Sequence, residues 1–271
     1  MTHRSLTIDD ASDQRLDDYR FLNDQAFRRR YEGHETFIAE GFVAIDRLVE
    51  SGHGVRSVLL APSRVERFAH LERFAADGVP VYVADRRVIA DVVGFDLHRG
   101  VIASAERRTH PSVDDVASTA SRLAVLEGLN DAENLGAIAR AARAFGIDAM
   151  IIDPTCTDPY SRRTVRVSMG EVLTLPIARA GAGDWPHIAE LLRSAGLETW
   201  AMTPSPVADD LWTLDPPPRL AAFLGAEGPG LGDATLAGAD RRVRLPIRAD
   251  VDALHVGQAA AVTFAAITRH G

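Results

Sequence analysis

The chain of 271 residues contains no lysine, so arginine supplies all 30 of its basic side chains. Without lysine, a Schiff-base enzyme, a P-loop nucleotide site and a lysine general base are all excluded. Every cationic side chain is instead a planar guanidinium with a permanent charge. Such a group is suited to contacts with phosphate and carboxylate.

The sequence has one cysteine, Cys156, which excludes a disulfide framework, a CxxC redox pair and a zinc site built from several cysteines. No stretch approaches the roughly 20 consecutive apolar residues that a membrane-spanning helix needs. The first residues are polar and acidic and lack an apolar stretch, so we expect no signal peptide. These features predict a soluble cytoplasmic protein with no membrane partner.

An excess of acidic side chains gives the chain a net charge of −8. This charge argues against non-specific binding along a polyanion, because such binding depends mainly on basic charge. It does not exclude a local basic patch.

Strand-like and helix-like segments alternate along both halves of the chain. In the first half, apolar periodicity predicts helices over 17–30, 36–50 and 63–76, and strands over 55–61, 80–84 and 100–105. In the second half it predicts strands over 123–126, 149–153, 173–178, 197–202, 220–225 and 243–247, and helices over 133–145, 161–167, 184–194 and 258–268. We therefore expect an α/β domain over 1–105, a linker over 106–121, and an α/β domain with a parallel sheet over 122–271.

Three stretches of the second half run from an apolar strand into a polar or glycine-rich loop and then toward a helix: residues 126–140, 223–232 and 245–261. In open α/β sheets, ligands bind outside the carboxyl ends of the strands, so these loops are candidate binding elements. Read separately, each also fits an ordinary role as a capped helix start, a flexible turn or a helix that closes the core. The second stretch has no G-x-G-x-x-G order and no Walker lysine, so it does not predict a nucleotide-phosphate loop.

In this order, the three stretches resemble the motifs of the SpoU (TrmH) family of RNA ribose 2′-O-methyltransferases, in the SPOUT superfamily. Residues 134–140 match the first motif, N-x-G-x-x-x-R, and residues 224–231 resemble the second, G-x-E-x-x-G. Residues 166–170 resemble the R-x-S-x-G link between these two motifs. The resemblance covers residues 122–269.

The first half is similar to the L30e-like domain that often precedes such a catalytic domain, through residues 37–41 and 94–101. The resemblance implies an L30e-like α/β substrate-binding domain over 1–105 and a SPOUT domain over 122–271, whose C-terminal chain threads a deep trefoil knot. It also implies S-adenosylmethionine as the cofactor, and a homodimer in which the partner subunit completes each site.

The resemblance assigns a set of residues in the knot loops to the cofactor, which would be bound in a bent shape. These residues are Thr203, Gly225, Glu227, Gly230, Leu245, Ile247 and Leu254.

The implied reaction is attack of a ribose 2′-oxygen on the methyl group of a sulfonium, which requires alignment and removal of one proton but no metal. Arg140 matches the arginine often proposed as the base. Because a guanidinium is effectively always protonated, we interpret Arg140 as a phosphate clamp that also stabilises the developing oxyanion. Asn134 would orient Arg140 or the ribose. Glu227 would hold its loop or a partner-subunit arginine, with a loop-bracing ion pair as the alternative.

The third motif departs from the family, because residues 253–255 read Ala-Leu-His where Ser-Leu-Asn is usual. Either the site has lost activity and only binds, or His255 acts as the base, since an imidazole titrates near ~6.5. A third interpretation is that His255 only packs beside the cofactor loop.

Two arginine clusters are candidates for RNA contacts: Arg28, Arg29 and Arg30, and Arg162, Arg163 and Arg166. Each could equally be a solvated face paired with acids. Aromatic residues are only 6% of the chain, which favours recognition of RNA shape and phosphate over base stacking.

The sequence thus predicts an S-adenosylmethionine-dependent RNA ribose 2′-O-methyltransferase that acts as a homodimer on structured rRNA or tRNA, without a metal. The alternatives are a non-catalytic RNA- or cofactor-binding module and a small-molecule α/β enzyme. The altered third motif and the acidic charge motivate the first of these.

Overall fold

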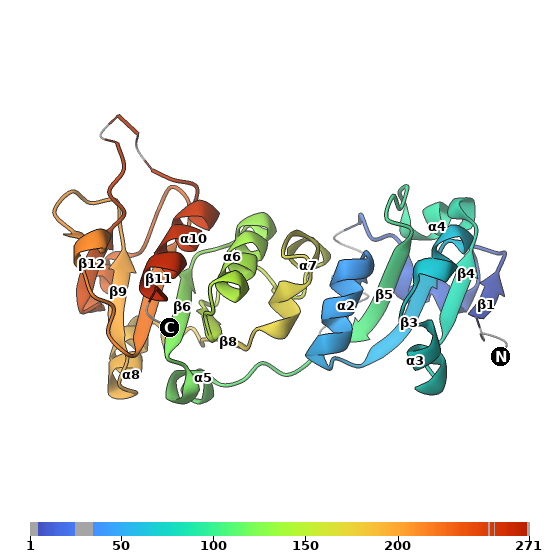
Figure 1. Ribbon diagram of the computed structural model, residues 1–271, viewed down its shortest axis with the longest axis horizontal. Coiled ribbons are helices and arrows are strands. Elements are labelled where there is room, and N and C mark those ends of the chain that lie inside the picture. The colour runs from blue at the N-terminus through green and yellow to red at the C-terminus, as the bar shows by residue number, and fades with distance from the viewer. Residues whose placement is uncertain (1–4, 25–34, 249, 252, 270–271) are drawn as a thin grey trace. The chain divides into compact units, whose positions relative to one another are not determined.

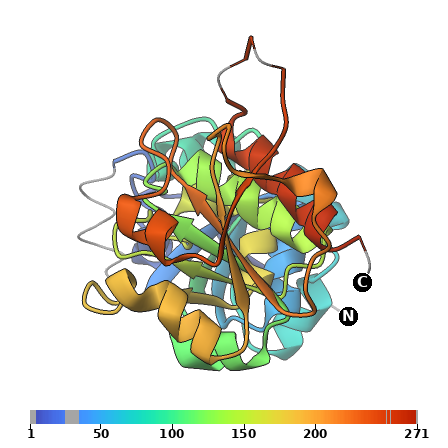
Figure 2. The same cartoon turned by 90° about the vertical axis from the view of Figure 1, so that its left-hand side faces the viewer.

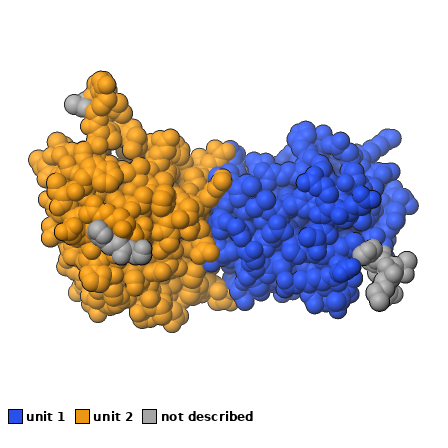
Figure 3. Space-filling model, viewed as in Figure 1, with its two compact units in different colours: residues 1–108, 160–174 blue, residues 109–159, 175–271 orange. Residues whose placement is uncertain are grey.

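The chain is divided by its internal contacts into two compact units, which Figure 3 shows in different colours. Unit 1 comprises residues 1–108 and 160–174, and unit 2 comprises residues 109–159 and 175–271. The computed structural model describes residues 5–24, 35–248, 250–251 and 253–269. Within these residues, no helix has the length and apolar character needed to cross a membrane.

Unit 1 is built on a five-stranded mixed sheet with the strand order β1-β4-β3-β5-β2 (Figure 1). Its strands are β1 (Ser5–Ile8), β2 (Thr36–Glu40), β3 (Val55–Leu60), β4 (Val81–Ala84) and β5 (Val101–Glu106). Its helices are α2 (Phe42–Ser51), α3 (Leu71–Ala76), α4 (Arg86–Val93) and α7 (Arg162–Val167), with 3₁₀ turns at Gln14–Tyr19, Pro62–Arg67 and Glu171–Thr174. The strand β4 is parallel to β1 and β3, whereas β5 is antiparallel to β2 and β3.

The helix predicted over 36–50 is wrong in its first part, because Thr36–Glu40 forms β2 and the helix α2 begins only at Phe42. Four consecutive residues of β2 are buried, so the strand carries apolar residues on both faces and shows no alternation. Gly41 separates the two elements with a φ of +93°, a conformation that glycine adopts readily.

The other helices predicted for the first half were also too long. The helix predicted over 17–30 is a 3₁₀ turn at Gln14–Tyr19, while residues 25–30 lie outside the described part of the chain. The helix predicted over 63–76 is divided into the 3₁₀ turn Pro62–Arg67 and α3. The strand β1 and the helix α4 were not predicted.

Unit 2 contains a seven-stranded sheet in which every pairing is parallel, with the order β10-β12-β9-β11-β6-β7-β8. Its strands are β6 (Arg122–Glu127), β7 (Ala149–Ile152), β8 (Ile177–Arg179), β9 (Glu198–Met202), β10 (Asp209–Asp210), β11 (Leu220–Gly225) and β12 (Arg241–Arg244). Its helices are α5 (Val113–Thr119), α6 (Ala132–Ala144), α8 (Ile188–Ser194), α9 (Asp233–Gly238) and α10 (Val256–Ile267), with 3₁₀ turns at Trp185–His187 and Leu211–Thr213. The predicted α/β fold with a parallel sheet is confirmed.

Helices cover both faces of this sheet, as Figure 2 shows. Residues of α5, α8 and α9 pack with Val125 of β6 and Phe223 of β11 in one apolar core. The adjacent strand residues Leu126 and Leu224 point to the other face because side chains alternate along a strand, and α6 and α10 pack together there. A parallel sheet covered in this way must be buried, which accounts for its continuous apolar strands.

The predicted linker over 106–121 contains the helix α5, which the sequence analysis did not predict. Ser112 accepts a hydrogen bond from the Asp115 amide, and Asp115 reaches back to the Ser112 amide, which forms a capping box. The helix is only seven residues long and buries just Val116 and Ala117, so its apolar period was too short to recognise. Within the strand predicted over 173–178, only 177–178 belongs to β8, and Glu171–Thr174 is a 3₁₀ turn.

Candidate active site

The carboxyl ends of four neighbouring strands of unit 2 lie at one edge of the sheet. In the observed register, Gly225 at the end of β11 is opposite Glu127 at the end of β6, and Val243 of β12 is opposite Met202 of β9. The amide of Thr203, just after β9, donates to the Val243 carbonyl at 2.9 Å. The loops that follow β6, β9, β11 and β12 therefore begin side by side, as expected for a ligand site in an open α/β sheet.

The loop 225–231 after β11 is folded back tightly on itself. The amide of Gly230 donates to the Ala226 carbonyl at 2.9 Å. A Cβ atom on Gly225 would lie 2.2 Å from the Gly230 carbonyl carbon, closer than any side chain allows. Glycine at position 225 is thus required for the close approach of the two backbone segments.

Glu227, at the tip of this loop, is bonded to the start of α10. Its Oε1 accepts a hydrogen bond from the Val256 amide at 3.1 Å and lies 3.4 Å from His255 Nε2. A carboxylate at a helix N-terminus is favourable because free amides and the helix dipole both present positive charge there. Glu227 therefore joins the second and third sequence motifs, and the loop-bracing role that we considered for it is present in the structure.

His255 caps the same helix. Its Nδ1 accepts a hydrogen bond from the Gly257 amide at 3.1 Å, so this nitrogen carries no proton. In the neutral imidazole the proton is then on Nε2, which faces Glu227; this tautomer follows from the hydrogen bonds. With one nitrogen accepting and the other protonated, His255 has no free lone pair for a general base, and the geometry favours a positioning role.

Replacement of His255 by asparagine, the residue usual in this motif, is expected to preserve activity. Asparagine also caps helices well, whereas alanine in its place costs about 0.5–2 kcal/mol of stability. Methyl transfer by His255→Asn measured between pH 6 and 9 should follow the wild-type profile, and thermal unfolding should show destabilisation only for His255→Ala. If the wild-type profile shows an ionisation near neutral pH that the His255→Asn profile lacks, His255 acts as the general base.

Asn134 and Arg140 lie on α6, which starts at the same sheet edge. Asp131 caps this helix by accepting from the Glu133 amide, and Asn134, in the first turn, is 8% exposed. Arg140 is exposed and makes no hydrogen bond or ion pair with any residue that the structure describes. The two residues are six positions apart, which separates them by about 9 Å along the helix axis and by about 120° around it.

The remaining cofactor residues lie on the segments after β9 and β12. Thr203 and Leu245 directly follow strand ends, while Ile247 and Leu254 are each 37% exposed. Exposed apolar side chains of this size beside backbone amides and carbonyls suit an adenine ring.

At the end of β6, Glu127 Oε2 is buried without a hydrogen-bond partner among the described residues. Because an unpaired buried carboxylate oxygen is costly, this atom suits a cationic or hydroxyl-bearing ligand. Sequence reasoning did not identify Glu127.

A family model described as the SpoU rRNA Methylase family matches residues 121–265, more than half of the chain. The chain belongs to the SpoU family. Among its relatives, an uncharacterized tRNA/rRNA methyltransferase of Mycobacterium tuberculosis is 41% identical over 268 residues, covering 97% of this chain and 91% of the relative.

Two further proteins extend this comparison. The crystal structure of an AdoMet-bound rRNA methyltransferase from Sinorhizobium meliloti matches with a TM-score of 0.80 and 27% identity, covering 98% of both chains. The 23S rRNA (guanosine-2′-O-)-methyltransferase RlmB of Ralstonia nicotianae is 28% identical over 231 residues, covering 82% of this chain and 91% of that protein.

The arginines predicted to contact RNA differ in their surroundings. In this SpoU protein, Arg162 belongs to unit 1, where its Nε and Nη2 donate to Glu40 Oε2 at 3.1 and 2.8 Å. Its guanidinium also lies over the Phe95 ring at 4.3 Å, and its side chain is only 19% exposed. This ion pair and the ring contact engage Arg162 within unit 1. Arg163 is exposed and Arg166 is half-buried, and the predicted cluster Arg28, Arg29 and Arg30 lies outside the described residues.

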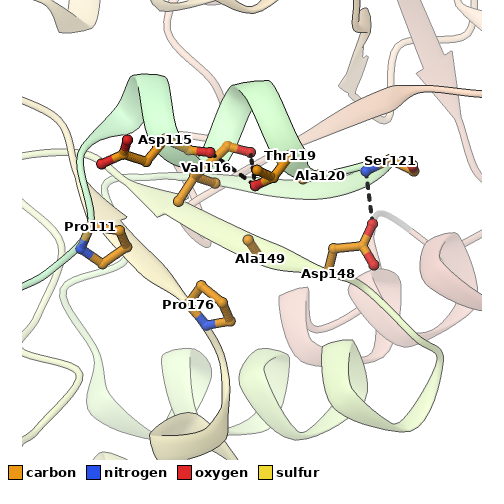
Figure 4. Close-up of a pocket in the computed structure, with 9 residues that line it drawn as sticks. All are labelled: Pro111, Asp115, Val116, Thr119, Ala120, Ser121, Asp148, Ala149 and Pro176. Carbon is orange, nitrogen blue, oxygen red and sulfur yellow. Dashed lines mark hydrogen bonds between the residues drawn. The ribbon is translucent and has the colours of Figure 1, made fainter.

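A separate hollow of about 340 Å³ lies at the opposite edge of the unit 2 sheet, near the amino ends of β6 and β7 (Figure 4). Its two carboxylates are already engaged, since Asp115 caps α5 and Asp148 accepts from the amides of Ser121 and Arg122. Neither carboxylate is therefore free to act in catalysis. Among the described residues of this SpoU chain, no cluster of His, Cys, Asp and Glu could hold a metal ion.

Proposed function

We propose that this protein is an S-adenosylmethionine-dependent methyltransferase that modifies ribose 2′-hydroxyls of tRNA or rRNA. The observation that carries the proposal is the sheet edge where the glycine loop 225–231, Glu227 and the start of α10 are bonded together in a SpoU family chain. The relatives named as tRNA/rRNA or 23S rRNA methyltransferases support the substrate class, and the Sinorhizobium protein supports the cofactor because it contains bound AdoMet.

In this proposal the chain aligns the reactants and stabilises charge. When bound, S-adenosylmethionine supplies a methyl group that is already activated on a sulfonium. Backbone groups of Gly225, Gly230 and Leu245, with the apolar Ile247 and Leu254, would hold it beside the strand ends, and Thr203 would border the same space. The 2′-proton would pass to a solvent water, and a guanidinium such as Arg140 would stabilise the negative charge that develops on the ribose oxygen. Asn134 would orient the ribose, while Glu227 and His255 fix the loop that carries Leu254.

The protein would act as a homodimer. In unit 2, Arg140 is exposed and free of partners in the described part of the chain, while the segment between β12 and α10 carries three exposed apolar side chains, Ile247, Val251 and Leu254. Such a segment is suited to burial against a second copy, so that Arg140 of one subunit serves the cofactor loops of the other. The trefoil knot and the cytoplasmic location implied by the family are part of the same proposal.

Unit 1 would bind the RNA through arginines that sequence reasoning missed. The side chain of Arg99 crosses the backbone of Gly41, where an added Cβ atom would lie 2.7 Å from Arg99 Cδ. The side chain of Arg64 crosses Gly100 in the same way, with an added Cβ atom 3.0 Å from Arg64 Nε. These two glycines are adjacent, because the Gly41 amide donates to the carbonyl of Val101 at 3.0 Å. Within the described residues neither arginine forms an ion pair. Arg99 Nη1 donates to the Glu40 carbonyl at 3.4 Å, and each guanidinium keeps further N–H donors for phosphate.

The double variant Arg64→Ala/Arg99→Ala is expected to bind RNA about 10-fold more weakly. The slope of log K against log salt concentration should fall by the amount that corresponds to roughly one to two phosphate contacts. Titration of labelled rRNA fragments at two salt concentrations measures both quantities. The control is Arg73→Ala, because Arg73 lies on α3 and is already near Asp77 at 3.6 Å. Equal affinities for the double variant and wild type would place the RNA surface elsewhere.

The function itself is tested with purified protein, methyl-labelled S-adenosylmethionine and unmodified tRNA or rRNA. We expect label in nucleosides whose 3′ linkage resists alkaline cleavage, which identifies a 2′-O-methyl group. Label in a base, or cofactor binding without transfer to any RNA, would contradict the proposal; the second result would favour the non-catalytic module.

A further inference from the structure

The turn that follows β7 is organised by a buried carboxylate. Asp153 is only 5% exposed. Its Oδ1 accepts hydrogen bonds from the amides of Thr155 and Cys156 at 2.9 and 2.7 Å, and the Thr155 hydroxyl contacts both of its oxygens at 2.9–3.0 Å. Burial of a carboxylate is costly unless hydrogen bonds replace its hydration, and these donors supply that replacement.

The same carboxylate reaches the loop before α6. Its Oδ2 accepts a hydrogen bond from the Gly128 amide at 2.9 Å. Gly128 has a φ of +71°, and the turn adds a second bond, from the Thr157 amide to the Leu129 carbonyl at 2.8 Å. The backbone that leads from β6 into α6 is therefore held in place by the turn 153–157.

The turn 153–157 is itself braced by Arg179 from β8. The Nη1 atom of Arg179 donates to the carbonyls of Asp153 and Cys156 at 3.0 and 2.9 Å, and Nη2 donates to the Thr157 carbonyl at 3.0 Å. A planar guanidinium can satisfy several acceptors in fixed directions, which a lysine cannot. The contacts therefore run from Arg179 through the turn to Gly128 and the start of α6.

We propose that Asp153 is a positioning residue for methyl transfer, because it fixes the β6–α6 loop and hence Asn134 relative to the cofactor loops. This inference rests on the proposed function. None of the Asp153 hydrogen bonds in the described structure goes to the segments after β9, β11 or β12. Glu127, which precedes Gly128, is held by the pairing of β6 with β11. Loss of Asp153 should therefore impair the reaction without impairing cofactor binding.

The test is Asp153→Asn, in which an amide group replaces one of the two accepting oxygens. We expect kcat for RNA methylation to fall about 10–100-fold, because small displacements of a positioned group are costly to rate. The Kd for S-adenosylhomocysteine, measured by calorimetry, and the KM for RNA should each change less than about 3-fold.

The matched control is Asp148→Asn at the other end of the same strand. Asp148 Oδ2 also accepts two backbone hydrogen bonds, each at 2.8 Å, from Ser121 and Arg122, the first of which Figure 4 shows. This control should lose similar stability but retain wild-type kcat. Equal kcat losses in both variants, or none in Asp153→Asn, would overturn the inference.

A second variant, Arg179→Lys, keeps the test decisive if Asp153→Asn does not fold. It should lower kcat to a smaller extent, again with an unchanged Kd for S-adenosylhomocysteine, and a wild-type kcat would count against the inference. Wild-type protein in the same assay separates failure of the proposed methyltransferase function from failure of the positioning role of Asp153. If the wild type transfers no methyl group, the proposed function fails; if it does and the variants match it, only the role of Asp153 fails.

Discussion

Replacement of Arg140 by alanine is expected to reduce methyl transfer about 100–1000-fold, the range found when one donor to a developing oxyanion is removed. Arg140 is exposed and unpartnered within the described residues, so the free energy of unfolding should change by less than about 0.5 kcal/mol. Because Arg140 is not bonded to the loops after β9, β11 or β12, the Kd for S-adenosylhomocysteine should be unchanged. Single-turnover transfer and calorimetry measure the two effects separately.

The control for this prediction is Arg193→Ala, on α8 at the opposite face of the sheet, where Arg193 lies 3.7 Å from Asp240. It removes the same charge and should leave the rate at the wild-type value. A rate for Arg140→Ala within about 3-fold of wild type would exclude Arg140 from the transition state.

Replacement of Gly225 by alanine is expected to weaken cofactor binding at least about 100-fold, or about 3 kcal/mol. The new Cβ atom would meet the backbone of Gly230 and Leu231 at 2.2–2.4 Å. The loop must then open, which displaces Glu227 from the start of α10. Calorimetric titration with S-adenosylhomocysteine measures the loss, and thermal unfolding measures how much stability is lost with it.

Gly183→Ala is the control for this second prediction, because a Cβ atom on Gly183 has no neighbour within 4 Å. Its cofactor affinity should equal that of wild type, and its stability should be equal or slightly higher. Unimpaired cofactor binding by Gly225→Ala would show that the loop 225–231 is not part of the site.

The two variants together test whether sites form between subunits. A mixture of Arg140→Ala and Gly225→Ala protein, unfolded and refolded together, should produce mixed dimers with one site that has both an intact loop and an intact arginine. Random pairing would restore about a quarter of the sites. Activity no greater than the sum of the two separate proteins would place Arg140 and the loop in the same subunit.

Sequence patterns predicted the elements of the candidate site well, because each combined an apolar strand with a sharp local signal. The strand predicted over 220–225 is β11 to the residue, and the helix predicted over 133–145 is α6 within one residue at each end. In both cases polar or glycine-rich residues follow a continuous apolar strand, and that contrast is local in the sequence.

The features that sequence reasoning missed depend on contacts between distant residues. The pairing of Arg162 with Glu40 joins positions 122 apart, and nothing near Arg162 in the sequence indicates it. The orphan oxygen of Glu127 is likewise visible only once the strands are in register. Charge alone could not distinguish an arginine held in an ion pair from one available to RNA.

The most direct test of the site is a crystal structure of the protein with S-adenosylhomocysteine. We expect the ligand at the carboxyl edge of the unit 2 sheet, with its nucleoside against the backbone of loop 225–231 and of Leu245 and Leu254. Its amino acid part should lie toward Glu127. A ligand bound in the hollow at the amino ends of β6 and β7, or elsewhere with the loop 225–231 empty, would contradict the account.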